Sequence, residues 1–117
     1  MNKEEVIKII RDYLSRQPVE WVGVFGSFAR NEMHADSDID VVLDFKENAK
    51  VNLFDFVGYK QDLEALLQRK IDLATYKYLR PKFKAVIDKD IQIIYKAAWK
   101  KTRFFTSNTL FPQWKPF

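Results

Sequence analysis

Four short runs rich in β-branched and aromatic residues alternate with helix-forming segments along the first 95 residues of the chain. The strands predicted from these runs cover 19–25, 38–45, 71–75 and 91–95. Helices are predicted over about 3–16 and 52–69, with a short helix at 27–30 and another from Pro81 onward. This alternation predicts the α/β (α+β) class, a small mixed β-sheet with flanking helices.

Apolar side chains within these segments suggest which faces are buried. Trp21 in the first strand is expected in the core, as is an apolar stripe on the long helix: Phe56, Leu63 and Leu67. The helix after Pro81 is expected to turn its apolar residues inward: Phe83, Val86 and Ile87. Asp44, near the end of the second strand, is expected to remain in water.

Length and composition exclude several classes of protein. A chain of 117 residues forms one domain that can bury a core without disulfides. The absence of cysteine excludes a thiolate nucleophile and any zinc site built on cysteine. The N-terminal stretch is charged and amphipathic, and no apolar run reaches membrane-spanning length. We therefore expect a soluble, cytoplasmic protein without a membrane partner.

The net charge of +4 is concentrated at the C-terminus. Five of the 20 basic residues lie beyond residue 95, while all 16 acidic residues lie before it, so residues 1–95 carry a charge of −1. The folded body is therefore not expected to bind nucleic acid by charge. We predict a domain over 1–96 and a basic, aromatic C-terminal extension over 97–117.

Gly26 and Ser27 lie where the first strand meets the short helix. A glycine at such a junction lets the backbone approach a ligand closely. The N–H groups at the start of a helix, beside a serine hydroxyl, suit an anionic phosphate. The same step also occurs in many α/β proteins as a simple turn, so the pair alone does not define a nucleotide site.

Asp38 and Asp40 lie at the start of the second strand with one residue between them. Because side chains alternate along a strand, both carboxylates are expected on one face, with Cα atoms roughly 6–7 Å apart. Ile39, Val41 and Leu43 would then face the core. Two carboxylates on one face repel each other unless a cation binds between them, and Mg²⁺ prefers carboxylate, water and phosphate oxygens. The simpler alternative is a pair of solvated acids.

Asp72 is the one acidic residue in the apolar strand at 71–75. If this strand pairs beside the strand of Asp38 and Asp40, the two backbones lie about 4.8 Å apart and a third carboxylate joins the first two. Three convergent carboxylates can hold two metal ions about 3.5–4 Å apart, the geometry of two-metal phosphoryl-type transfer. Asp72 would then be placed to accept the proton of the nucleophile.

The same acidic residues also resemble the ligand positions of a calcium-binding loop: Asp36, Asp38, Asp40, Asp44 and Glu47. Such a loop needs a glycine at its sixth position for a sharp turn, and Val41 stands there. The surrounding residues also favour a strand. Calcium binding by this loop is therefore not expected.

The combined motif resembles the signature of the DNA-polymerase-β-like nucleotidyltransferase superfamily: Gly26-Ser27, ten residues, Asp38-x-Asp40, and a later Asp72 on its own strand. Within it, GSFARNEMHADSDIDVVLDF and IDLAT are most similar to the minimal nucleotidyltransferases (MNT), antitoxins encoded beside HEPN toxins. The resemblance covers about 3–95. It implies a polymerase-β-like fold, with 1–96 as the minimal nucleotidyltransferase domain; the extension over 97–117 has no counterpart in the pattern.

The resemblance also implies roles for individual residues. Gly26 and Ser27 would bind the nucleotide triphosphate, helped by Arg30. Asp38 and Asp40 would ligate two Mg²⁺ ions, and Asp72 would supply the third carboxylate. The family often has glycine after this arginine, whereas Asn31 stands here. Asparagine tolerates a left-handed backbone, so the turn is expected to persist.

The activity implied by the resemblance is transfer of AMP from ATP to a hydroxyl, often a tyrosine, of the cognate HEPN toxin, with which the protein would form a hetero-oligomer. A core of about 95 residues leaves little room for an acceptor-binding domain, so the acceptor is expected on another protein. One alternative is a catalytically inactive binding module that neutralises its partner by occlusion. Another is a small nucleic-acid-binding protein that depends on 97–117.

Overall fold

The computed structural model describes residues 1–32, 34 and 36–98. The elements in chain order are α1 (Lys3–Leu14), β1 (Val19–Phe25), α2 (Gly26–Ala29), β2 (Ile39–Phe45), α3 (Leu53–Leu67), β3 (Ile71–Thr75), η1 (Tyr76–Tyr78), α4 (Pro81–Asp88) and β4 (Gln92–Lys96). Every predicted strand and helix is present within a few residues of its expected bounds. The 3-10 helix η1 was not expected from the sequence. Most of the extension, residues 99–117, lies outside the described residues, so the prediction made for it is not tested.

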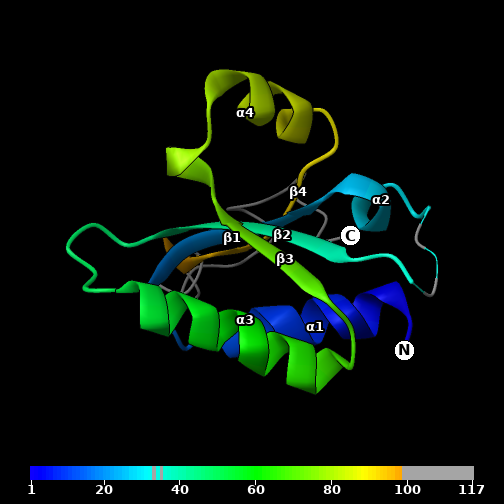
Figure 1. The fold of residues 1–117 in the computed structure, drawn as a ribbon, viewed down its shortest axis with the longest axis horizontal. Helices are drawn as coiled ribbons and strands as arrows, with labels where there is room; N and C mark the ends of the chain where they lie inside the picture. Colours follow the sequence, from blue (N-terminus) through cyan, green and yellow to red (C-terminus); the bar gives the residue numbers. More distant parts are fainter. Residues whose placement is uncertain (33, 35, 99–117) are drawn as a thin grey trace, which may run out of the picture.

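The four strands form one mixed sheet in the order β3-β2-β1-β4 (Figure 1). β1 runs antiparallel to both β2 and β4, whereas β2 and β3 are parallel. A parallel pair cannot be joined by a tight turn, and α3 provides the long crossover connection between these two strands. The predicted small mixed sheet with flanking helices is confirmed.

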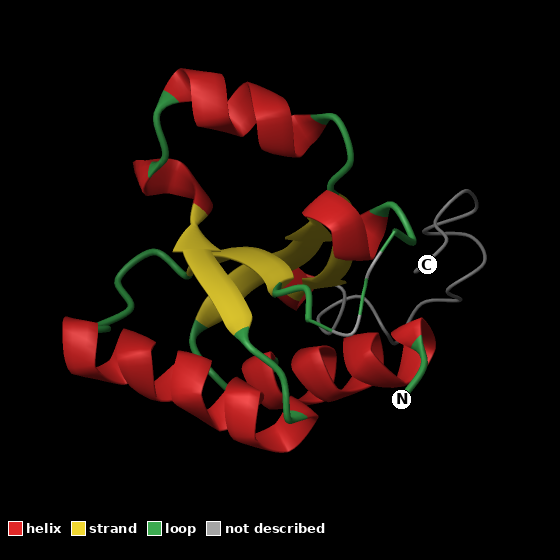
Figure 2. Cartoon of the chain, turned by 45° about the vertical axis from the view of Figure 1, so that its right-hand side comes forward, coloured by secondary structure: helices red, strands yellow, loops and turns green. Residues whose placement is uncertain are grey.

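α1 and α3 pack against one face of the sheet, and α4 lies on the opposite side (Figures 1 and 2). α1 is capped by Asn2, whose side chain accepts a hydrogen bond from the backbone N–H of Glu5. α3 begins with a capping box formed by Asn52 and Asp55, and it ends at Gln68 in the left-handed conformation. Side-chain capping thus defines the start of both helices.

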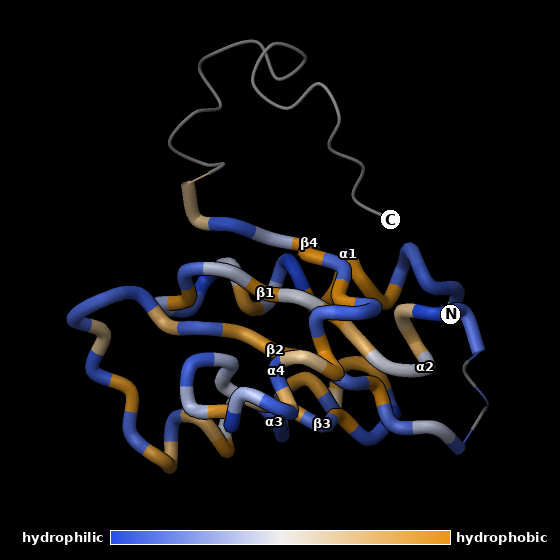
Figure 3. Tube along the Cα trace, turned by 90° about the horizontal axis from the view of Figure 1, so that it is seen from above, coloured by the Kyte–Doolittle hydropathy of each residue, from blue (hydrophilic) through white to orange (hydrophobic). Residues whose placement is uncertain are grey.

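The core lies between these two helices and the sheet. Its fully buried members alternate along each strand or recur at helical spacing, including Ile7, Ile10, Val22, Val24, Ile39, Val41, Leu43, Leu63 and Ile94. Figure 3 shows hydrophobic segments along β1, β2 and β4. The predicted stripe on α3 is confirmed, because Leu63 and Leu67 are buried and Phe56 packs against the same cluster. One face of β2 is therefore buried in the core, and the other face can carry polar side chains.

Two predictions about burial are wrong. Trp21 is half-buried rather than part of the core cluster, and its ring meets that of Tyr76 edge-on at 5.5 Å. Val22 takes the core position because side chains alternate along the strand. On α4, Phe83 and Val86 are 50% and 61% exposed, and of the three expected residues Ile87 alone is buried. α4 stands apart from the sheet, so a full apolar stripe has nothing to pack against.

Within the described residues, no helix combines the length and the apolar character that crossing a bilayer requires.

Candidate active site

Asp40 and Asp72 lie directly opposite each other on neighbouring parallel strands. The register of β2 and β3 pairs Ile39 with Ile71, Asp40 with Asp72, and Val41 with Leu73. The apolar residues on either side of each aspartate are buried. Because side chains alternate across a sheet, both carboxylates belong to the face away from α1 and α3. The predicted adjacency of the two strands is confirmed.

Asp38 is exposed and lies one residue before β2 begins. The segment before it is held by Arg69, whose Nη2 donates hydrogen bonds to the backbone oxygens of His34 at 2.8 Å and Ser37 at 2.5 Å. The backbone N–H of Ile39 donates to the oxygen of Lys70 at 3.0 Å. The connection between α3 and β3 therefore sets where Asp38 enters the sheet.

The carboxyl group of Asp40 has a strongly shifted pKa. Its pKa is raised to about 6, first by partial burial and then by the negative charges of Asp72 and Asp38. The positive charge of Arg30 acts in the opposite direction, as a smaller effect. Asp38 and Asp72 are thus both close enough to act electrostatically on Asp40.

Gly26 lies against the carboxylate of Asp40. It has a left-handed backbone, with φ of +69°, and a Cβ built on it would lie 2.3 Å from Oδ2 of Asp40. The last residue of β1, Phe25, is paired with Asp40 in the sheet, which places the following Gly26-Ser27 step beside the acidic residues. Ser27 lies in the first turn of α2. The backbone at this position therefore lies too close to the Asp40 carboxylate for any residue with a side chain, which explains the glycine.

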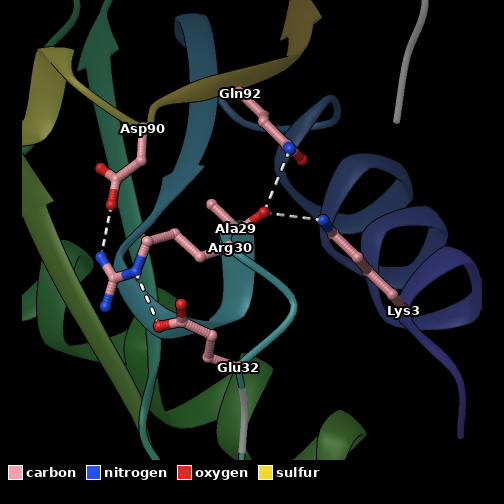
Figure 4. A network of polar contacts seen from close by, with 6 residues as sticks. All are labelled: Lys3, Ala29, Arg30, Glu32, Asp90 and Gln92. Atoms are coloured by element: carbon pink, nitrogen blue, oxygen red, sulfur yellow. Dashed lines mark hydrogen bonds and ion pairs between the residues drawn. The ribbon is translucent and has the colours of Figure 1, made fainter.

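Arg30 follows α2 and is 47% exposed. Its Nε donates to Oε2 of Glu32 at 3.0 Å, and its Nη1 donates to Oδ2 of Asp90 at 2.5 Å (Figure 4). Asn31 has a left-handed φ of +62°, so the turn expected without a glycine is confirmed. Sequence reasoning missed Asp90, which lies 60 residues further along the chain in the turn between α4 and β4.

Asp44 is not simply solvated, as the sequence analysis expected. Its Oδ1 accepts a hydrogen bond from the backbone N–H of Lys77 at 3.0 Å. Lys77 belongs to η1, which follows β3 directly. Asp44 therefore fixes the first turn of chain beyond β3. No pattern in the sequence pointed to this contact, because the two residues lie 33 positions apart.

Among residues 1–32, 34 and 36–98, no three His, Asp or Glu side chains form a closed group that could hold a metal ion. Of the three carboxylates expected to converge, Asp40 and Asp72 are therefore paired in register, whereas Asp38 does not join them in a closed group. This donor set fits Mg²⁺, which is usually held by one or two carboxylates together with water and substrate phosphates. The repulsion that raises the pKa of Asp40 is also what a divalent cation relieves.

The sheet topology, the paired aspartates and the Gly-Ser step match a known family. The model described as nucleotidyltransferase domain matches residues 4–95, and the chain belongs to this family. Protein adenylyltransferase MntA of Thermococcus cleftensis is 36% identical over 81 residues, which cover 66% of this chain and 80% of that protein. MJ0435 of Methanocaldococcus jannaschii, provisionally named a protein adenylyltransferase, is 37% identical over 84 residues, which cover 72% of this chain and 88% of the relative.

Solved structures share the fold. One, described provisionally as a minimal nucleotidyltransferase, superposes with a TM-score of 0.66 at 29% identity. The superposition covers 78% of this chain and 94% of the chain in that structure. A crystal structure of a toxin-antitoxin with AMP-PNP gives a TM-score of 0.65 at 16% identity. This superposition covers 96% of this chain and 94% of the chain in that structure. The fold is therefore that of minimal nucleotidyltransferases.

Proposed function

We propose that this protein is an antitoxin that transfers AMP from ATP to a hydroxyl of a cognate HEPN toxin, with a tyrosine as the acceptor. The observation that carries the proposal is the register of Asp40 with Asp72 on parallel strands, with Gly26 in contact with Asp40. The relative named protein adenylyltransferase MntA and the similarity to a toxin-antitoxin bound to AMP-PNP support the activity and the kind of partner.

In this proposal the residues divide into two groups. Gly26, Ser27 and Arg30 bind the triphosphate of ATP, with the backbone of the Gly-Ser step close to the phosphates and the guanidinium offering positive charge. Asp38, Asp40 and Asp72 would hold Mg²⁺, as two ions in the two-metal form of this chemistry. Bound Mg²⁺ would neutralise charge on the triphosphate and lower the pKa of the attacking hydroxyl.

The transfer forms a bond between the acceptor oxygen and the α-phosphorus of ATP and breaks the bond between the α-phosphorus and the bridging oxygen. Pyrophosphate leaves with that electron pair. Asp72 accepts the proton of the acceptor hydroxyl on a carboxylate oxygen, a role that its exposed position permits. The orientation of the acceptor is left to the partner protein, because the sheet and its helices supply no separate acceptor-binding domain among the described residues.

The proposal is tested with the purified protein, its HEPN partner, Mg²⁺ and ATP labelled at the α-phosphate. We expect label on the partner, and we expect Asp38→Asn to lower the rate at least about tenfold because one carboxylate is lost. Asp12→Asn is the control, since Asp12 is exposed on α1, on the opposite side of the sheet. The transfer rate of this control should equal that of the wild type.

Absence of label on the partner with the wild-type protein would contradict the proposal. A variant with both Asp38→Asn and Asp40→Asn that still neutralises the partner in cells would instead favour inhibition by occlusion. Mass spectrometry of the labelled partner identifies the acceptor residue.

A further inference from the structure

The end of α2 is held by side chains from both ends of the domain. The backbone oxygen of Ala29 accepts hydrogen bonds from Nζ of Lys3 at 3.0 Å and from Nε2 of Gln92 at 3.2 Å (Figure 4). Lys3 also donates to Oδ1 of Asn31 at 2.9 Å. These contacts join α1, α2 and β4. The segment that begins with the Gly-Ser step and ends with Arg30 is therefore fixed to the rest of the domain at its far end.

Asp90 and Glu32 both pair with Arg30, and their surroundings differ. The side chain of Glu32 is 63% exposed, whereas that of Asp90 is 19% exposed. An ion pair with a solvent-exposed acid does little to fix the position of either side chain. The attraction within a less solvated ion pair is screened less by water and salt. Asp90 is therefore the stronger constraint on the guanidinium of Arg30.

The backbone around Asp90 is itself anchored. The N–H groups of Asp90 and Ile91 donate to the oxygen of Ile87, at 3.2 Å and 2.9 Å, at the end of α4. Ile87 is buried. Two residues after Asp90, Gln92 begins β4 and contacts Ala29. The turn between α4 and β4 is thus a fixed support from which Asp90 reaches Arg30.

Arg30 lies beside the candidate site. Its backbone N–H donates to the oxygen of Gly26 at 3.1 Å, and Gly26 lies against the carboxylate of Asp40. A guanidinium that pairs with Asp90 is therefore held at the end of the segment that begins with the Gly-Ser step. A free arginine side chain loses rotamer entropy when it binds a phosphate. An arginine that is already held in place loses less, so the entropic cost of phosphate binding is lower.

We propose that Asp90 is a positioning residue for ATP, which holds the guanidinium of Arg30 where the triphosphate binds. The inference rests on the proposed function, since it assigns Arg30 to the nucleotide. Asp90 touches neither ATP nor the acceptor in this scheme and acts through Arg30. Loss of its charge should weaken ATP binding and leave the rate at saturating ATP close to that of the wild type.

The test is the ATP dependence of AMP transfer to the partner. Asp90→Asn should raise KM for ATP about fivefold to tenfold with kcat changed less than about twofold, and Asp90→Glu should restore most of the loss. Asp88→Asn is a matched control. Asp88 lies two residues before Asp90 and instead accepts a hydrogen bond from the hydroxyl of Tyr76 at 2.8 Å. KM of this control should not change.

A double-mutant cycle shows whether Asp90 acts through Arg30. In an Arg30→Ala background, Asp90→Asn should leave KM unchanged. An unchanged or lowered KM for Asp90→Asn alone would overturn the inference, as would an equal effect of Asp90→Asn with and without Arg30. If the wild-type protein transfers no AMP, the proposed function itself fails. Direct titration with AMP-PNP and Mg²⁺ then measures whether Asp90→Asn still weakens nucleotide binding.

Discussion

Asp40→Asn should lower AMP transfer by on the order of 1000-fold and at the same time make the metal-free protein more stable at neutral pH. The activity is lost because the carboxylate in register with Asp72 no longer binds a cation. The stability rises because an uncharged amide of the same shape replaces a charge that is partly buried and repelled by Asp72 and Asp38.

The sign of the pH dependence follows from the direction of the shift. The pKa of Asp40 rises from an ordinary value of 3.8 to about 6 in the folded protein. The folded state therefore binds a proton more tightly than the unfolded chain. This contribution to stability is fully present below about pH 4 and is lost as the pH rises through about 6. Wild-type protein should thus lose stability relative to Asp40→Asn across this window.

The expected gain is about 1 kcal/mol above pH 7. The full shift would correspond to about 3 kcal/mol, and it is reduced because Asp40 remains partly solvated and its interactions are screened. Urea unfolding of both proteins in EDTA, from pH 4 to pH 8, measures the difference. Glu47→Gln, an exposed loop substitution, should differ from wild type by less than about 0.5 kcal/mol at every pH.

Addition of excess Mg²⁺ gives a second readout of the same carboxylate. Mg²⁺ should stabilise the wild-type protein, because a ligand that binds the folded state alone raises the free energy of unfolding. It should have a smaller effect on Asp40→Asn. If Asp40→Asn is less stable than wild type at pH 7.5 in EDTA, then Asp38, Asp40 and Asp72 do not repel one another as the structure indicates.

Gly26→Ala should reduce AMP transfer by about 100-fold and lower the free energy of unfolding by about 2 kcal/mol. The new Cβ would lie 2.3 Å from Oδ2 of Asp40, so either the carboxylate or the Gly-Ser backbone must move. A shift of about 1 Å in a reacting group can cost about 100-fold in rate. The left-handed φ of +69° adds backbone strain for any residue with a Cβ.

Gly58→Ala is the matched control for this substitution. Gly58 lies within α3, and beyond the neighbouring helix backbone a Cβ placed there would meet open space among the described residues. Alanine in a helix interior is favoured over glycine, so we expect a gain of about 0.5–1 kcal/mol and unchanged transfer. Urea unfolding and the labelled-ATP assay measure both quantities. Equal activity for Gly26→Ala and wild type would contradict the close contact between Gly26 and Asp40.

The parts of this protein that depend on local pattern could be predicted from its sequence. The period of apolar residues predicts the helices and strands, and alternation along β2 places Asp40 opposite Ile39 and Val41. The tolerance of asparagine for a left-handed backbone predicts the turn at Asn31. These features arise from interactions between residues a few positions apart, so they require no knowledge of the remaining chain.

The tertiary structure decided the features that join distant segments. The pairing of Asp40 with Asp72 depends on a parallel β2–β3 register, and the contact of Arg30 with Asp90 depends on where α4 returns to the sheet. The exposure of Phe83 depends on how far α4 stands from the sheet, and the half-burial of Trp21 depends on the ring of Tyr76 in η1. Each of these follows from the packing of the whole core, because pairing energies between remote strands and helices are shared among many residues and leave no periodic signal in the sequence.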